Sequence, residues 1–311
     1  MKHALITFGN EESYGLLFVG GELERHNQQV RFFDGEDKRS LTQVRDWQPN
    51  FAMFSPLTTF YPLAKTFAED LPTKVTKVFG GHHALARPEI VDDNHVDAVV
   101  VGPVRGSIER LLRGDRGIIH TYPTTPGDLP KPARQQYYKD IPRMGVRYRK
   151  FVLSMMGCCW NCSYCSSSSG HLQEVFSPQE HKDYYLTRRP ISDVMAEVGQ
   201  IMEYPTREIE WVDDDIFSGR DCEAWLLEFA EVWTKKVLKS SDIIDPYGEV
   251  KEVVPMYVST TSHGANTISD EVLSSLKRCV NVVGMGIQAI RPDSLKPVSY
   301  THLTLPTTPY V

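Results

Sequence analysis

Apolar residues in the first 115 positions come in short runs separated by amphipathic stretches. Five runs have the length and continuity of strands buried on both faces, at residues 3–8, 29–33, 51–54, 76–79 and 97–101. The amphipathic stretches between them, such as 62–71 and 107–112, predict helices, and Pro62 stands where a first helical turn tolerates proline. Strands that alternate with helices predict a parallel sheet in a doubly wound α/β domain, flavodoxin-like or Rossmann-like.

Ligands of doubly wound domains bind beyond the carboxyl ends of the strands. The candidate positions in the loops at those ends are Gly9, Ser55, Leu57, Thr58, Gly80, Gly81, His82 and Gly102. Glycine lets the backbone approach a flat or bulky ligand because it has no Cβ. The pair His82 and His83 is more typical of loop packing, or of a hydrogen bond to a ligand edge, than of a metal site.

Residues 117–149 interrupt this alternation. Five prolines fall between positions 123 and 142, and the apolar periodicity is lost. We therefore expect an ordered connector over 117–149, which separates a first domain at 1–116 from a second domain at 150–297.

Strand and helix patterns resume after this connector. Strands are expected at residues 148–156, 208–212, 253–258 and 281–287. Helices are expected at 191–204, 221–238 and 269–277. If these βα units belong to a (β/α) barrel, the chemistry should lie at the carboxyl ends of the strands.

A cluster of cysteines follows the first strand of the second domain. Cys158, Cys162 and Cys165 have the spacing C-x3-C-x2-C, and an aromatic residue, Tyr164, precedes the last of them. Thiolates are the usual ligands of a [4Fe–4S] cluster, and three on one tight loop leave one iron open to another ligand. The open iron is what a reductive cleavage of S-adenosylmethionine (SAM) requires.

A structural zinc site is the alternative interpretation, with Cys159 or a distant histidine as the fourth ligand. The sequence lacks the second paired half-site that such sites usually show. Cys222 and Cys279 occur singly in helical and apolar surroundings, which predicts small buried residues rather than ligands.

The cysteine loop resembles the signature of the radical SAM superfamily. Upstream, the run 78–84 followed by 96–102 looks like the cobalamin-binding domain that precedes many radical SAM cores. The resemblance covers residues 1 to about 296 and implies a doubly wound, B12-binding-type domain followed by an incomplete (β/α) radical SAM partial barrel. In that family the strand-end loops embrace the corrin ring.

The sequence departs from this family in the first domain. Many cobalamin proteins carry D-x-H-x-x-G after the first strand, with a histidine that coordinates cobalt, but residues 9–13 contain no histidine. The usual acidic Gly-Glu-Gly-Glu is replaced at 102–106 by Gly-Pro-Val-Arg-Gly. Radical SAM proteins often bind cobalamin without a lower histidine, so cobalamin binding stays the expectation. A domain that kept the fold and lost the corrin is the alternative.

The resemblance also assigns residues to SAM. It implies that Tyr164 lies against the adenine and that Asp213 or Asp214 contacts the methionine ammonium. Gln288 lies in a run like the family's Gly-x-Glu/Gln-Ser strand end and would contact the ribose or the carboxylate. We expect Asp215 to cap a helix.

Together these features imply a radical SAM enzyme with a [4Fe–4S] cluster, SAM and cobalamin as cofactors. An external donor such as flavodoxin or ferredoxin would reduce the cluster, a 5′-deoxyadenosyl radical would form, and methylcobalamin would donate a methyl group to an unactivated carbon. A radical cyclase or rearrangement enzyme is the close alternative, and a non-catalytic metal-binding module or an inactive fragment is another. The methylthiotransferase branch is disfavoured because it needs N-terminal cysteines for a second cluster, and residues 1–157 contain none.

Composition restricts the partners. The net charge is −6 and Lys and Arg form no block, so no nucleic-acid surface is indicated, and the substrate is expected to be a small molecule or peptide. No secretory segment and no apolar run of about 18–20 residues is present, which predicts a cytoplasmic protein without a membrane span.

The last residues, 298–311, contain no Asp, Glu, Lys or Arg and break the βα rhythm. They resemble a translated sequencing-adapter read-through. We expect this tail to be non-native and two strands of the family's six-stranded partial barrel to be missing.

Overall fold

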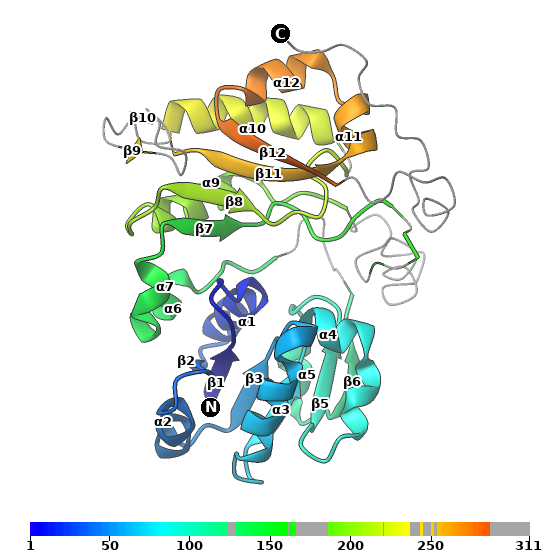
Figure 1. The fold of residues 1–311 in the computed structure, drawn as a ribbon. Helices are drawn as coiled ribbons and strands as arrows, with labels where there is room; N and C mark the ends of the chain where they lie inside the picture. The colour runs from blue at the N-terminus through cyan, green and yellow to red at the C-terminus, as the bar shows by residue number, and fades with distance from the viewer. Residues whose placement is uncertain are drawn as a thin grey trace. The chain divides into compact units, whose positions relative to one another are not determined.

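The computed structural model describes residues 1–122, 129–160, 162–163, 165, 186–219, 221–236, 243–244, 250–251 and 254–286. These residues fall into two compact units, the first ending at Val146 and the second beginning at Arg147. Each unit is an α/β fold with its own parallel sheet (Figure 1), which confirms the predicted class. Tyr164, Gln288 and the tail at 298–311 lie outside the described residues. Within the described part, no helix is long and apolar enough to cross a membrane.

The first unit contains a six-stranded sheet in the order β2-β1-β3-β4-β5-β6, with every neighbouring pair parallel. Its strands are β1 (Lys2–Thr7), β2 (Gln29–Asp34), β3 (Phe51–Phe54), β4 (Thr76–Phe79), β5 (Ala98–Val101) and β6 (Gly117–His120). The five strands predicted from apolar runs are present. All four residues of β3 are buried, as are the last five of β1, which is the pattern of strands covered on both faces.

Five helices connect these strands: α1 (Tyr14–Arg25), α2 (Ser40–Trp47), α3 (Tyr61–Glu69), α4 (Gly81–Ala86) and α5 (Ser107–Arg113). Proline stands in the first turn of α3, where its missing N–H costs no helical hydrogen bond. Ion pairs join α1 to α5. The Tyr61 ring of α3 stacks on His83 of α4 at 4.2 Å.

The stretch expected as a connector contains regular structure. Its first residues form β6, and α6 (Arg134–Asp140) and α7 (Pro142–Gly145) follow. The sequence did not predict β6 because glycine and histidine at its ends leave only two apolar residues between them. Pro142 begins α7 rather than preventing a helix, since a first turn tolerates proline.

The second unit contains a four-stranded parallel sheet in the order β12-β11-β8-β7. Its strands are β7 (Arg149–Val152), β8 (Glu208–Trp211), β11 (Met256–Thr261) and β12 (Val280–Gly286). The strand predicted at 253–258 ends three residues later than expected, which brings Thr260 and Thr261 to its carboxyl end. A separate antiparallel pair is formed by β9 (Ile243–Ile244) and β10 (Val250–Lys251).

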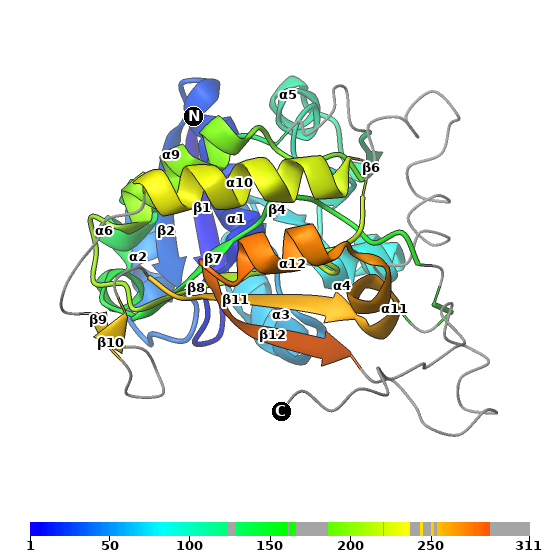
Figure 2. The same cartoon turned by 90° about the horizontal axis from the view of Figure 1, so that it is seen from above.

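Helices cover one face of this sheet. They are α9 (Ile191–Ile201), α10 (Cys222–Lys236) and α12 (Asp270–Leu276), and the short α11 (Ser262–Thr267) follows β11. Figures 1 and 2 show α10 and α12 side by side over the sheet. The core between them is aromatic: Trp211 of β8 meets Phe229 of α10 edge to face, and Trp225 stacks on Phe229 at 5.1 Å. This packing fixes the strand ends from which the functional loops leave.

A buried histidine lies in the first sheet. The His3 side chain of β1 is inaccessible to solvent, and its ring stacks on Phe51 of β3 at 4.9 Å. Its Nε2 lies 3.4 Å from Gln28 Oε1. Burial lowers the pKa of His3 from 6.5 to about 4, because the imidazolium would lose its hydration.

Acid is therefore expected to destabilise the first unit through His3. The unfolded chain binds a proton below pH 6.5 and the folded chain does not until about pH 4, so stability is lost as the pH falls between these values. The loss from this group is about 3 kcal/mol. Urea unfolding at pH 7.5 and pH 4.5 measures it, and His3→Leu should reduce the difference. An equal difference in that variant would assign the acid sensitivity to other groups.

Candidate functional site

The three predicted cluster ligands lie on the loop that leaves the carboxyl end of β7. Gly157 adopts a φ of +86°, a left-handed conformation that suits glycine, and turns the chain directly before Cys158. Cys162 is buried, and Cys158 and Cys165 are half-buried. The Cys165 N–H donates to the Cys162 carbonyl at 3.1 Å. The described part of the loop therefore turns at Gly157 and between Cys162 and Cys165, and it carries three thiols beyond the carboxyl end of β7.

The remaining cysteines differ from these. Cys159 is exposed, and its hydrogen bond with Cys158 raises the pKa of the Cys158 thiol; burial and the nearby Asp214 carboxylate raise it further. The same hydrogen bond lowers the pKa of Cys159. Cys222 and Cys279 are buried free thiols outside this loop, as the sequence predicted.

Asp213, predicted as a SAM contact, is a buried carboxylate at the end of β8. Its Oδ1 accepts from the backbone N–H groups of Ser154 at 2.7 Å and Met155 at 3.3 Å. Its Oδ2 accepts from the Ser154 hydroxyl and from Arg188 Nη1, the latter at 3.1 Å. Burial raises the pKa of the Asp213 carboxyl, and Arg188 and the hydrogen bonds from Ser154 oppose that rise. Both oxygens are thus engaged within the protein.

Arg188 is a site residue that the sequence analysis missed. Its Nη1 donates to the Ser154 hydroxyl and to Asp213, and its Nη2 donates to the carbonyls of Ile216 and Ser218. Its guanidinium also lies 5.0 Å from the Trp225 ring centroid. One buried cation therefore joins the ends of β7 and β8 to the loop before α10. The sequence pointed to such a residue only through the run of carboxylates at 213–215, because buried carboxylates need a cation nearby.

The two other carboxylates of that run have different environments. Asp214 is exposed and lies close enough to Cys158 to raise the pKa of its thiol. Asp215 is fully buried, and its Oδ1 accepts from the Phe217 N–H at 3.1 Å, which is the contact of a local turn. The expected helix cap is wrong, because the next helix, α10, begins only at Cys222. Of the three, Asp214 is the carboxylate that faces solvent beside the cysteine loop.

The strand-end loops of the first unit meet where the direction of winding changes. The strand β1 pairs with both β2 and β3, so the chain continues on opposite sides of it. Gly15 and Gly81 both lie close to Ser55. A Cβ on Gly15 would lie 3.2 Å from the Ser55 hydroxyl oxygen, and a Cβ on Gly81 would lie 2.2 Å from it. A Cβ on Gly9 would lie 3.0 Å from the Phe60 ring. Three of the predicted positions, Gly9, Ser55 and Gly81, are thus at close-packed loop contacts.

The other predicted positions of the first unit are mostly exposed. Leu57 is 54% exposed, and Thr58 and His82 are also exposed. His83, by contrast, is buried between Thr58 and Tyr61, as predicted for loop packing. Gly80 and Gly102 are partly exposed, and a Cβ on Gly102 would lie 2.2 Å from the Thr121 carbonyl oxygen. These loops therefore contain exposed side chains and also glycines at which a Cβ would clash with neighbouring atoms.

Replacing Gly81 with alanine is expected to destabilise the first unit by about 1–3 kcal/mol. Its φ of +78° is strained for alanine, and the new Cβ would overlap the Ser55 hydroxyl. Gly106→Ala is the matched control, because φ is +84° there and no atom lies within 4 Å of the added Cβ. Urea unfolding should show the larger loss at Gly81. Equal losses would show that crowding at Ser55 contributes nothing.

The loop after β1 is fixed by the helices of the expected connector. Arg134 of α6 donates from Nη1 to both Glu12 oxygens, at 3.3 and 3.2 Å, and all of these atoms are buried. The Tyr138 hydroxyl donates to Glu12 Oε1 at 2.5 Å. Arg143 donates to the Gly9 carbonyl at 3.1 Å. Residues 9–13, which lack a histidine, therefore have a buried glutamate that is turned inward.

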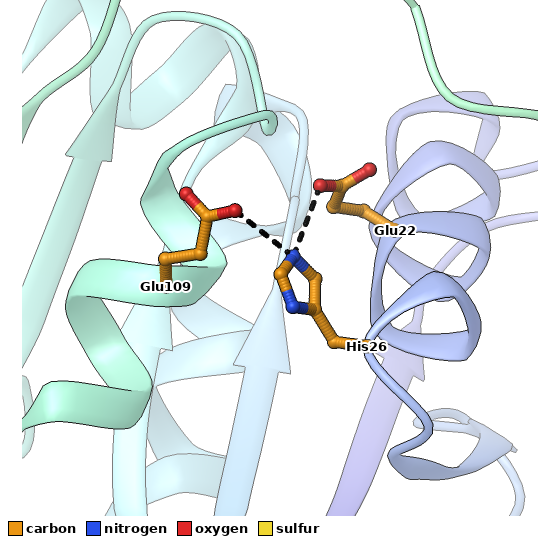
Figure 3. A group of neighbouring side chains, drawn as sticks. All are labelled: Glu22, His26 and Glu109. Carbon is orange, nitrogen blue, oxygen red and sulfur yellow. Dashed lines mark ion pairs between the residues drawn. The ribbon is translucent and has the colours of Figure 1, made fainter.

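A second group of potential metal ligands occurs on α1 and α5. His26 Nε2 lies 3.4 Å from Glu22 Oε1 and 3.3 Å from Glu109 Oε1 (Figure 3). Arg25 Nη2 lies 2.5, 3.5 and 3.1 Å from the same three ligand atoms. Burial raises the pKa of Glu22, but Arg25, Arg105 and His26 outweigh this effect and lower it. The Arg25 guanidinium occupies the position of a cation, so the group is an ion-pair network.

Comparisons with known proteins bear on both units. No protein-family model matches the chain. The tRNA-2-methylthio-N(6)-dimethylallyladenosine synthases of Shewanella sp. (strain W3-18-1) and Shewanella putrefaciens are 22% identical over 237 residues, which are 69% of this chain and 45% of theirs. The Psychrobacter arcticus synthase is 26% identical over 170 residues, 47% of this chain and 31% of its own. The matched region is less than half the length of these curated relatives.

Two solved structures of the radical SAM methyltransferase TsrM from Kitasatospora setae are similar over 94% of this chain. One has cobalamin and a [4Fe–4S] cluster bound, with a TM-score of 0.66, 15% identity and 62% of its chain covered. The other has tryptophan substrate and a SAM analogue bound, with a TM-score of 0.64, 15% identity and 60% covered. The cobalamin-dependent SAM radical enzyme OxsB has a TM-score of 0.65 at 12% identity, over 93% of this chain and 44% of its own.

The chain shares the fold of the cobalamin-dependent radical SAM enzymes. This likeness extends over both units and confirms the resemblance that the cysteine loop and the upstream runs indicated.

Proposed function

We propose that this chain is a radical SAM enzyme whose second unit holds a [4Fe–4S] cluster through Cys158, Cys162 and Cys165. The carrying observation is the three-thiol loop at the carboxyl end of β7, with Asp214 exposed beside it, in a chain with the radical SAM fold. When bound, such a cluster supplies the electron for reductive cleavage of SAM. The chain's part is to position three thiolates and to shield them from solvent.

The geometry favours Asp214 over Asp213 for the methionine ammonium of SAM. The Asp213 oxygens already accept four hydrogen bonds from Ser154, Met155 and Arg188. Asp214 is exposed on the cysteine side of the same strand end. In this proposal Asp213 fixes the strand end and Asp214 attracts the ammonium. Tyr164 and Gln288 remain proposed SAM contacts on the strength of the sequence pattern alone.

We place cobalamin at the strand-end loops of the first unit. Gly9, Gly81 and Gly102 let these loops pack closely on Phe60, Ser55 and Thr121, and Leu57 and His82 offer exposed side chains. A corrin bound at these loops would supply a methyl group. Glu12, engaged by Arg134, is not available to coordinate cobalt, so any corrin would be held without a ligand from this residue.

Methyl transfer to an unactivated carbon of a small molecule or peptide is the outcome we favour. Its support is the likeness to TsrM, a methyltransferase, over 94% of the chain. The curated relatives are methylthio synthases, but residues 1–157 of this chain contain no cysteine for a second cluster. A cyclisation or rearrangement uses the same cofactors and is the second candidate. We further propose a cytoplasmic location and a flavodoxin or ferredoxin as electron donor.

Anaerobic reconstitution tests this proposal. The purified chain is incubated with iron, sulfide and hydroxocobalamin, and then with dithionite and SAM. Iron with acid-labile sulfide, corrin that stays with the protein, and 5′-deoxyadenosine are the expected results. If the protein instead contains zinc without sulfide and forms no 5′-deoxyadenosine, the proposal is wrong and the cysteine loop is a structural metal site.

A further inference from the structure

Asp215 has more partners than its local turn with Phe217 needs. Besides the Phe217 N–H, its Oδ1 accepts from the Thr260 hydroxyl at 2.7 Å. Its Oδ2 accepts from the Thr261 hydroxyl at 2.9 Å and from Trp160 Nε1 at 3.0 Å. The carboxylate is fully buried. Hydrogen bonds from neutral donors to a buried carboxylate are stronger than those between neutral groups, so each of these contacts contributes more than an ordinary one.

Asp215 and these side-chain partners belong to three separate segments. Trp160 lies midway between Cys158 and Cys162 on the cysteine loop, Asp215 follows β8, and the threonines end β11. The surroundings are fitted closely around the carboxylate, because a Cβ on Gly264 would lie 3.1 Å from Asp215 Oδ1 and 2.7 Å from Thr260 Oγ1. Asp215 thus connects the middle of the cysteine loop to the end of a neighbouring strand.

The Trp160 ring is also held from its other side. Its indole meets the His263 imidazole edge to face, with ring centroids 4.8 Å apart. His263 belongs to α11, which directly follows β11. The hydrogen bond attaches Trp160 to the segment after β8, and the ring contact attaches it to α11 after β11. The loop is therefore fixed at a point between two of the predicted ligands.

We propose that the hydrogen bond from Trp160 to Asp215 is a latch that restrains the cysteine loop between Cys158 and Cys162. Both residues are positioning residues: neither touches the cofactors in this proposal. The inference rests on the proposed function for its purpose, but the contacts of Trp160 with Asp215 and His263 stand without it. If Asp215 only formed its local turn, it would require only Phe217, and the loss of the Trp160 N–H would leave the loop unaffected.

The test measures alkylation of each cysteine in the metal-free protein by mass spectrometry after timed exposure to iodoacetamide. Trp160→Phe removes the indole N–H and keeps an aromatic ring against His263. We expect Cys158 and Cys162 to react about tenfold faster in this variant, because a hydrogen bond to a charged group is lost. Asp215→Asn should give an increase of the same kind. Cys279, buried in the same unit, should keep its rate.

Trp225→Phe is the matched control. It removes an indole N–H that donates to the Arg189 carbonyl at 2.9 Å in the same unit. This change should leave the rates of Cys158 and Cys162 as they are. Unchanged rates in Trp160→Phe, or an equal rise at Cys279, would overturn the latch, since the first shows no restraint on the loop and the second shows a general loss of structure.

The result is separable from the proposed function. Faster alkylation in Trp160→Phe supports the latch even if the parent chain binds no iron, which would remove the radical SAM proposal alone. Reconstitution to full iron and sulfide content with unchanged alkylation rates would remove the latch and leave the enzyme proposal standing.

Discussion

Cys162→Ala is expected to lower 5′-deoxyadenosine formation from SAM by more than about 100-fold, because the loss of an outer-shell partner alone costs a metal site roughly 10–100-fold. Cys162 is the buried member of the three thiols, and its carbonyl accepts the Cys165 N–H, so it lies at the centre of the turned loop. A cluster left with two protein thiolates on this loop would lose iron. The measurement is iron and sulfide content of the reconstituted variant together with the nucleoside yield.

Cys279→Ala is the control for this prediction. Cys279 is a buried thiol in the same unit, and burial raises its pKa to about 12, so it is a neutral packing residue. The variant should retain iron, sulfide and nucleoside production, with a modest loss of stability from the missing sulfur. Nucleoside formation that survives in Cys162→Ala and fails in Cys279→Ala would contradict the assignment of the cluster to residues 158–165.

The sequence predicted the sheets because buried parallel strands have an unmistakable composition. Residues 51–54 and 98–101 are almost wholly apolar, and the structure places them in the interior of a parallel sheet. The strand β6 was not predicted, because its ends are glycine and histidine and only two of its residues are apolar. Spacing along the chain also predicted Cys158, Cys162 and Cys165 as ligands, because ligands on one loop are close in sequence. Their metal binding remains a proposal.

The roles of the three aspartates needed the structure. Residues 213–215 are all aspartates, so the sequence does not distinguish them. The fold buries Asp213 and Asp215 and leaves Asp214 exposed. The partners that decide their roles, Arg188 and Trp160, lie 25 and 55 residues away along the chain. No local pattern encodes such pairings. A row of carboxylates at a strand end indicates a functional site. The role of each carboxylate can be assigned only from its long-range contacts.

Arg188→Met is expected to destabilise the second unit by about 3–5 kcal/mol, because it leaves the buried Asp213 carboxylate without its cation. The side chains of Arg188 and Asp213 are 2% and 0% exposed, so solvent does not compensate for the loss. The carbonyls of Ile216 and Ser218 would lose a donor as well. Urea unfolding followed by tryptophan fluorescence measures this, since four of the five tryptophans belong to the second unit.

Asp213→Asn in the same chain should recover part of that loss, because a neutral amide no longer needs the cation and still accepts from the Ser154 N–H. The two substitutions should therefore be non-additive by about 1–3 kcal/mol. Arg149→Met is the comparison: its side chain is half-exposed beside Glu208, and its loss should stay within about 1 kcal/mol. Equal effects of the Arg188 and Arg149 substitutions would mean that the buried ion pair does not hold the ends of β7 and β8 together. The placement of Asp214 beside the cysteine loop would then depend on backbone packing alone.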